Sequence, residues 1–437
     1  MFATSAGVAR TLSALRHRNF RLFFLGQGVS RIGTWMQQVA MNWLVYRLTG
    51  SPAALGLVAF AGYFPAFVLG PFAGVLADRR SRYRVVLATQ MSAATLAAAL
   101  AALVLTGVVE VWHVVVLAAL VGVVNGFDVP ARQALLVELV GGTGDLPNAI
   151  ALNSSMFNAA RLVGPAIAGI LIGLVGEGLV FLIDAASYLA VIGGLLAIHV
   201  PATPRPRDRP PVLRTLRDGF GYAYGFPPIR AILALLALVS LLGMPYAVLL
   251  PVFASDVLGG GAHTLGFLTA AAGLGALTAA VWLASRTTVR GLGRVIVAAA
   301  TLFGFGLVVF SRSRVEWLSL VLLVIAGFGV MATTASINTV LQTIVEEDKR
   351  GRVMSFYTMA FMGMTPFGGL LAGILADWIG APNTVLLGGL AVMLAAAWFA
   401  RRLPVLRAHI LPIYERLGIV SEVATGIQTA TELRPRS

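Results

Sequence analysis

The feature that most constrains the fold is a series of long apolar runs, separated by short polar or Gly/Pro-rich stretches. An α-helix crosses the ~30 Å hydrocarbon core of a bilayer in about 20 residues. Runs of about this length predict membrane spans at 21–46, 53–77, 85–107, 112–131, 148–175, 178–200, 230–257, 264–286, 294–311, 316–343, 353–377 and 380–401. Only 11% of the residues are charged, against about 25% in soluble domains. We therefore expect an all-α integral membrane protein with twelve transmembrane helices.

Two segments without long apolar runs divide the chain. Residues 201–229 are rich in Pro and Arg and indicate a cytoplasmic connector, and residues 403–437 form a mostly polar, loose cytoplasmic tail. The predicted units are an N-terminal six-helix half over 1–200 and a C-terminal six-helix half over 230–402. The first apolar run is span-length and lacks a small-residue cleavage site, so we expect an uncleaved helix rather than a signal peptide.

The basic residues are distributed unevenly between the two sides of the predicted membrane. With the N-terminus in the cytoplasm, 27 of the 32 Lys and Arg residues fall in cytoplasmic segments. Only Arg47, Arg312 and Arg314 fall on the opposite side. This distribution follows the positive-inside rule and predicts that both termini are cytoplasmic. The net charge of +14 is thus explained by topology, and we expect no nucleic-acid partner.

Several kinds of chemical site are excluded by residue types that are absent or scattered. The chain has no cysteine, so disulfides and thiolate metal sites cannot form. The one lysine, Lys349, lies in Asp348-Lys349-Arg350 and not in a phosphate-binding P-loop. The five histidines fall in loops or at span ends. We expect no metal, no cofactor and no enzymatic activity; the alternatives from other classes are a membrane enzyme and a non-transporting membrane scaffold.

The two halves resemble each other in sequence. At an offset of about 210 residues, Gly33, Gly50 and Leu55-Gly56 correspond to Gly243, Gly260 and Leu265-Gly266. Such a parallel repeat of six spans is the transporter architecture of the major facilitator type, in which a central cavity lies between the halves.

The loop between the second and third predicted spans reads GVLADRRSRYR, from Gly74 to Arg84. It resembles the G-x-L-A-D-R-x-G-R-[KR] loop of the major facilitator superfamily, with two departures, Ser81 for Gly and Tyr83 for a basic residue. The resemblance implies a conformational gating role for four residues: Gly74, Asp78, Arg79 and Arg82. An ordinary basic loop that satisfies the positive-inside rule is the alternative.

The fifth predicted span contains Arg161-Leu-Val-Gly164-Pro165-Ala-Ile-Ala-Gly169. It is similar to the antiporter motif of proton-coupled exporters in the same superfamily, although generic packing of small residues would give the same pattern. Together with Asp128-Val-Pro-Ala-Arg132 and Ser30-Arg31-Ile-Gly33, it resembles the branch that holds the enterobactin exporter and the macrolide-efflux pumps, the transmembrane secretion effectors. This resemblance covers residues 18–404.

Polar side chains within the spans are the candidates for substrate contact. Four of them are separated by four or seven residues on the first span and so share one helix face: Gln27, Arg31, Gln38 and Asn42. Asn125 and Asn338 complete the predicted cavity set. The alternative role for these residues is polar contact between helices. A charged group at this depth costs at least ~2.5 kcal/mol, which favours a functional role.

Two carboxylates lie within spans, Asp128 and Asp184. Proton coupling requires a titratable group near a basic partner. Asp128 is spaced i,i+4 from Arg132, which favours a local ion pair, and Asp184 is predicted to pair with Arg161. We assign Asp128, Arg161 and Asp184 as candidates for proton coupling.

These observations and the resemblance together imply a monomeric secondary transporter in a bacterial inner membrane. It is expected to export a hydrophobic or amphipathic small molecule, such as a drug, a macrolide or a siderophore, by alternating access and proton antiport. The alternative is an importer or facilitator of the same fold.

Overall fold

The computed structural model describes residues 13–79, 81–140, 144–198, 221, 224–286 and 288–419, with the backbone alone for residues 71–79. The described residues form helices and no strands. The first bundle contains η1 (Ser13–Arg16), α2 (Arg18–Thr49), α3 (Pro52–Arg79), α4 (Arg82–Leu105), α5 (Val111–Val140) and α6 (Leu146–Leu196). The second bundle contains α8 (Pro227–Leu238), η2 (Val239–Gly243), α9 (Tyr246–Val252), η3 (Phe253–Val257), α10 (Ala262–Ala284), α11 (Leu292–Phe310), α12 (Glu316–Ile344), α13 (Glu347–Met362), α14 (Met364–Ile379) and α15 (Ala381–Arg416).

Ten helical segments of the described chain are long and apolar enough to cross a membrane. One of them, α6, has 51 residues and at 1.5 Å per residue is too long for a single crossing. Its backbone leaves helical geometry at Gly176, where φ is 79° and ψ is 168°, between the predicted spans 148–175 and 178–200. Polar side chains keep α2 outside the ten segments. An all-helical membrane protein is therefore confirmed, and the exact count of twelve spans stays a prediction.

Two elements differ from the predicted boundaries. The predicted span 353–377 consists of α13 and α14, which meet at Gly363. The predicted tail begins at residue 403, but α15 continues through Pro404 to Arg416. This extension is helical because apolar side chains, including the buried Leu406, pack against the core of the second bundle. The boundaries of the two halves stay a prediction, because most of the connector lies outside the described residues.

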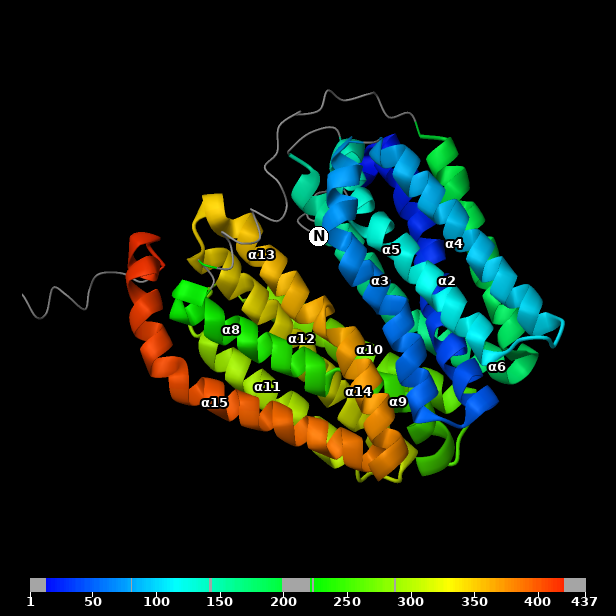
Figure 1. Ribbon diagram of the computed structural model, residues 1–437. Coiled ribbons are helices and arrows are strands. Elements are labelled where there is room, and N and C mark those ends of the chain that lie inside the picture. The colour runs from blue at the N-terminus through cyan, green and yellow to red at the C-terminus, as the bar shows by residue number, and fades with distance from the viewer. Residues whose placement is uncertain are drawn as a thin grey trace, which may run out of the picture.

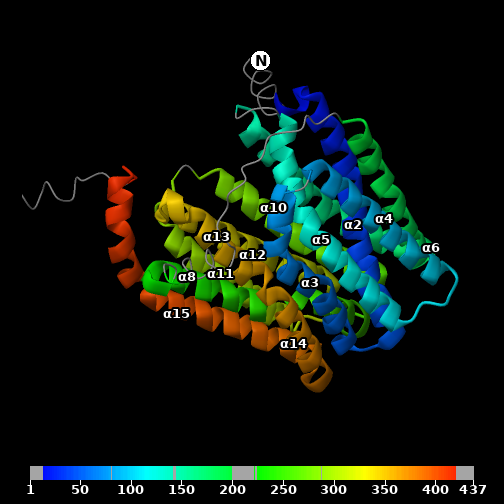
Figure 2. The same cartoon turned by 45° about the horizontal axis from the view of Figure 1, so that its top comes forward.

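The two bundles meet at one end of the molecule and diverge toward the other (Figure 1). Contact between them runs chiefly along α3 with α14 and α6 with α10. Turning the view by 45° shows the same separation (Figure 2). Each bundle has buried aromatic residues of its own, among them Phe20 and Phe23 in the first and Phe303 and Phe399 in the second.

The end at which the bundles meet, called the joined end here, is closed by glycines and by hydrogen bonds. A Cβ added to Gly56 would lie 2.7 Å from the carbonyl oxygen of Gly369 and 3.1 Å from Cα of Gly373. The Tyr46 hydroxyl donates to Asp256 at 2.5 Å. Only residues without a side chain allow two helix backbones to approach this closely. The opposite end, called the open end, carries the first residues of α2, α4 and α13 and is the predicted cytoplasmic side.

The predicted repeat has a structural counterpart at the joined end. Gly266, the repeat partner of Gly56, packs against the other bundle in the same way: its Cβ would lie 2.8 Å from Cα of Gly169. Gly56 on α3 thus contacts α14, and Gly266 on α10 contacts α6. The two glycine contacts join the bundles at related positions, as two parallel six-helix halves require.

Candidate functional site

The predicted polar stripe lies along α2, and its members have different surroundings. Gln27 is buried, and its Oε1 accepts a hydrogen bond from Arg132 at 3.2 Å. Gln38 is half-buried and donates to Asn42 at 3.2 Å. The stripe is therefore partly interhelical contact, as at Gln27, and partly a row of amides paired along one helix face.

The second bundle offers a comparable amide pair on α12. The Gln342 Nε2 atom donates to Asn338 Oδ1 at 2.6 Å. Asn125 on α5 has an exposed side chain and lies seven residues before Arg132, which places both on one helix face. Asn125 is thus exposed and Asn338 half-buried, whereas Gln27 is buried.

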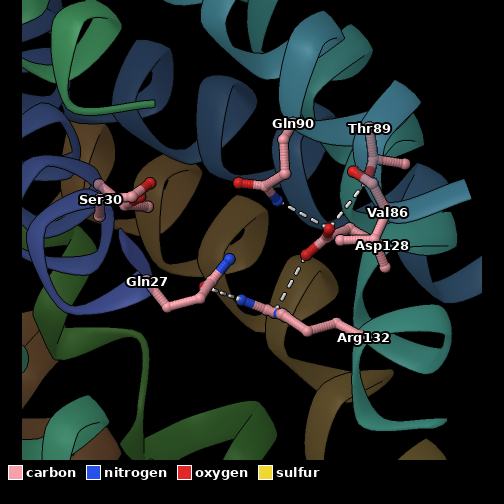
Figure 3. Close-up of polar contacts among 8 residues, drawn as sticks. Gln27, Ser30, Val86, Thr89, Gln90, Asp128 and Arg132 are labelled. Carbon is pink, nitrogen blue, oxygen red and sulfur yellow. Dashed lines mark hydrogen bonds and ion pairs between the residues drawn. The ribbon is translucent and has the colours of Figure 1, made fainter. Parts of the chain in front are cut away.

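A buried network surrounds Asp128 (Figure 3). Its Oδ1 accepts hydrogen bonds from Thr89 Oγ1 at 2.9 Å and Gln90 Nε2 at 2.8 Å. Its Oδ2 lies 3.1 Å from Arg132 Nη2. The ion pair predicted from the i,i+4 spacing is confirmed. Through Arg132 the network reaches Gln27, and so it ties α2, α4 and α5 together near the open end.

Sequence reasoning missed Thr89 and Gln90 as partners of Asp128. A signal was present, since Thr89-Gln90 is a polar pair inside the apolar run 85–107. What the sequence did not contain is the rotation of α4 about its axis, which points both side chains at α5. A carboxylate with two donors and a cation is a satisfied buried charge, and this arrangement stabilises the first bundle.

Two further in-span arginines, Arg31 and Arg161, lie over aromatic rings, and Arg31 is also within electrostatic range of the buried Asp128. The Arg31 guanidinium carbon is 6.0 Å from the centroid of the Phe157 ring, and that of Arg161 is 5.8 Å from the Trp35 ring. The two rings meet edge to face at 5.9 Å. Together the four side chains form a continuous row from α2 to α6. Cation–π contact favours a charge at membrane depth without neutralising it.

The predicted ion pair between Arg161 and Asp184 is wrong. Asp184 is fully buried, and its nearest hydrogen-bonding partner is Ser187, whose hydroxyl lies 3.4 Å from Oδ1. Its Oδ2 has no hydrogen-bond partner among the described residues. The Asp184 side chain faces α2, where a Cβ at Gly33 would approach Oδ1 to 2.5 Å. Arg161 is turned instead toward Trp35, so the two charges do not meet.

The glycines predicted as an antiporter motif form close helix contacts. A Cβ at Gly164 would lie 2.6 Å from Cβ of Trp35 on α2. A Cβ at Gly169 would lie 2.8 Å from the carbonyl oxygen of Ala262 on α10. Pro165, between them, places its carbonyl oxygen 2.5 Å from where a Cβ of Gly266 would stand. The motif therefore connects α6 to its own bundle and to the opposite one.

The predicted gating loop is described in part. Gly74, Asp78 and Arg79 lie in the last turns of α3, where the structure describes the backbone alone. Arg82, at the start of α4, forms an ion pair with Glu138 of α5 at 2.9 Å. This pair joins two helices of the first bundle at the open end, so Arg82 holds α4 against α5.

The relatives of this chain are transporters. The staphyloferrin A transporter of Staphylococcus aureus is 27% identical over 85% of this chain and 93% of its own length. The multidrug efflux pump Tap of Mycolicibacterium fortuitum is 30% identical over 83% of this chain and 90% of its own. Macrolide efflux protein A of Streptococcus pyogenes is 23% identical over 87% and 96%.

Solved structures share the fold. A bacterial homologue of the iron transporter ferroportin in an inward-facing state superposes with a TM-score of 0.65 at 19% identity, covering 88% of this chain and 98% of that one. The family model described as transmembrane secretion effector matches residues 9–415. All of these matches are to transporters and none is to an enzyme. This chain belongs to the transmembrane secretion effector family of major facilitator transporters.

Proposed function

We propose that this protein exports a hydrophobic or amphipathic small molecule by alternating access, in exchange for protons. The substrate class of a drug, a macrolide or a siderophore follows from what the named relatives carry. In this proposal the protein is a monomer in a bacterial inner membrane, with both termini in the cytoplasm. The open end then faces the cytoplasm, and substrate enters the cavity from there.

The observation that carries the proposal is the row of Arg31, Phe157, Trp35 and Arg161 at mid-span. Neither arginine forms an ion pair with a carboxylate among the described residues, although each lies at a depth where a charge is costly. Phe157 is 40% exposed, so an aromatic surface is accessible beside the cations. Aromatic faces flanked by guanidinium groups suit a ligand that is apolar and carries negative charge or acceptor groups.

Proton coupling is assigned to the buried carboxylates Asp184 and Asp128. Asp184 Oδ2 has no hydrogen-bond partner to lose, so binding a proton there removes a buried charge without breaking a contact. Asp128 is already held by Arg132 and two donors, so proton binding there breaks an ion pair and loosens α5 from α4. The two sites therefore differ in what protonation does, and Asp184 is the better candidate for reversible binding.

The test is transport by inside-out membrane vesicles that have been acidified by respiration. A substrate exported by proton antiport dissipates the acid-inside gradient when it is added. We expect Arg31→Ala and Arg161→Ala to abolish dissipation by an anionic substrate, while Arg314→Ala, an exposed arginine outside the cavity, retains it. Asp184→Asn should still bind substrate but no longer release protons.

Three results contradict parts of this proposal. Unchanged export by Arg31→Ala removes that residue from the substrate site. Unchanged proton-driven efflux in both Asp184→Asn and Asp128→Asn removes the coupling assignment. Substrate movement that never alters the proton gradient indicates a facilitator or an importer of the same fold.

A further inference from the structure

A pocket of about 420 Å³ lies in the second bundle, away from the row of Arg31, Phe157, Trp35 and Arg161 in the first. It is formed where the N-terminus of α11 meets the end of α15, with one side chain each from α8 and α12. In both views α11 and α15 lie on the side of the second bundle that is farther from α2–α6 (Figures 1 and 2). All the lining residues belong to the second bundle, so the pocket lies within that bundle and apart from the substrate candidates on α2 and α6.

Three arginines line this pocket: Arg290 just before α11, Arg294 in its first turn and Arg407 on α15. All three are exposed. None forms an ion pair with a carboxylate among the described residues. Three like charges around one pocket repel one another, so an anion bound between them relieves an unfavourable interaction. The backbone adds to this field, because the positive end of the α11 helix dipole lies here: the helix begins at Leu292, and its N-cap residue is Gly291.

The remainder of the lining is apolar. Ile232, Phe399, Leu403 and Ile410 are among the side chains that form this apolar wall of the pocket. Leu403 packs closely against the start of α11, since a Cβ at Gly293 would lie 2.8 Å from its Cδ1. A soluble anion does not bind more tightly because of an apolar wall, whereas a lipid acyl chain packs against one.

The pocket also lies at the right depth. It is at the open end, the predicted cytoplasmic side, where α11 begins and α15 leaves its predicted span near residue 401. Lipid headgroups lie at this level, and basic pockets between transmembrane helices on the cytoplasmic side bind anionic lipids. The extension of α15 from Leu403 to Arg416 forms one wall of the pocket.

We propose that this pocket binds one anionic phospholipid, with its phosphate among Arg290, Arg294 and Arg407 and an acyl chain along the apolar wall. The proposal does not depend on the substrate or on proton coupling. It gives a role to the helical extension of α15, which encloses the headgroup.

The test is lipid binding to the purified full chain, measured by native mass spectrometry. Phosphatidylglycerol and phosphatidylcholine with identical acyl chains are titrated separately. We expect tighter binding of phosphatidylglycerol. The triple variant R290Q/R294Q/R407Q should lose about 100-fold in affinity, about fivefold per arginine. The triple variant R290K/R294K/R407K keeps the charge and should retain most of the binding.

The matched control is R16Q/R18Q/R21Q, which removes three exposed arginines from the same predicted side of the first bundle. It should bind phosphatidylglycerol like the natural protein. Equal binding of the two lipids overturns the proposal, as does unchanged binding by a folded R290Q/R294Q/R407Q variant. Displacement of the lipid by low-millimolar inorganic phosphate also overturns it, because the pocket would then be a site for a free anion.

Discussion

The contact between Gly169 on α6 and α10 gives the sharpest test of how the two bundles move. In Gly169→Ala the new Cβ would lie 2.8 Å from the carbonyl oxygen of Ala262 and 3.0 Å from Cα of both His263 and Gly266. Comfortable contact between heavy atoms is about 3.5–4.0 Å. The helices must therefore separate by roughly 0.5–1 Å, and no rotamer change relieves the overlap because all three atoms belong to the backbone.

Overpacking of this kind costs about 1–3 kcal/mol. In the proposed alternating-access cycle α6 and α10 part at the joined end to release the substrate, so the cost applies only to the conformation in which that end is closed. Gly169→Ala should therefore shift the conformational equilibrium by about 5- to 150-fold toward the state that is open at the joined end. Transport should slow, because one of the two alternating states becomes scarce.

The control lies four residues further along the same helix. A Cβ at Gly173 meets nothing within 4 Å, so Gly173→Ala should leave the equilibrium unchanged. Since the chain has no cysteine, spin labels can be attached at Arg84→Cys and Ser285→Cys, both exposed at the open end. Double electron–electron resonance then reports their separation, and we expect it to shorten in Gly169→Ala alone. The same distance distribution in both glycine variants would refute the reasoning.

Three further predictions concern other contacts. Tyr46→Phe removes the hydrogen bond to Asp256 and should favour opening of the joined end. The distance between the spin labels at positions 84 and 285 should then shorten. An unchanged distance would show that this bond does not hold the two bundles together at the joined end. The hydrogen bonds that Asp145 accepts from Ser13 and His17 hold the pKa of its carboxyl below the usual value. These bonds anchor the N-terminal segment, and the anchor should be intact above pH ~4 and lost as the pH falls below it. Hydrogen exchange of residues 13–18 that does not depend on pH in this range, after correction for intrinsic rates, contradicts this prediction. Asp184→Asn removes a buried charge with an unpaired oxygen and should raise the free energy of unfolding by about 1–3 kcal/mol, while proton-coupled transport is lost; a lowered melting temperature argues against an unsatisfied carboxylate.

The sequence alone determined that this is an all-helical membrane protein, and its motifs indicated the family. Runs of apolar residues must lie in lipid whatever their neighbours are, and the distribution of Arg and Lys sets orientation without reference to packing. The ion pair of Asp128 with Arg132 was also predictable from the sequence, because residues four apart on a helix are neighbours.

Only the tertiary structure decided which distant side chains meet. Arg161 lies over Trp35 and not beside Asp184, because close backbone contacts at Gly164 and Gly169 fix how α6 is rotated about its axis. The same holds for Gln90, whose bond to Asp128 depends on how α4 faces α5. Helix rotation and the end at which the bundles meet are set by packing between residues far apart in the chain, and no local pattern in the sequence specifies them.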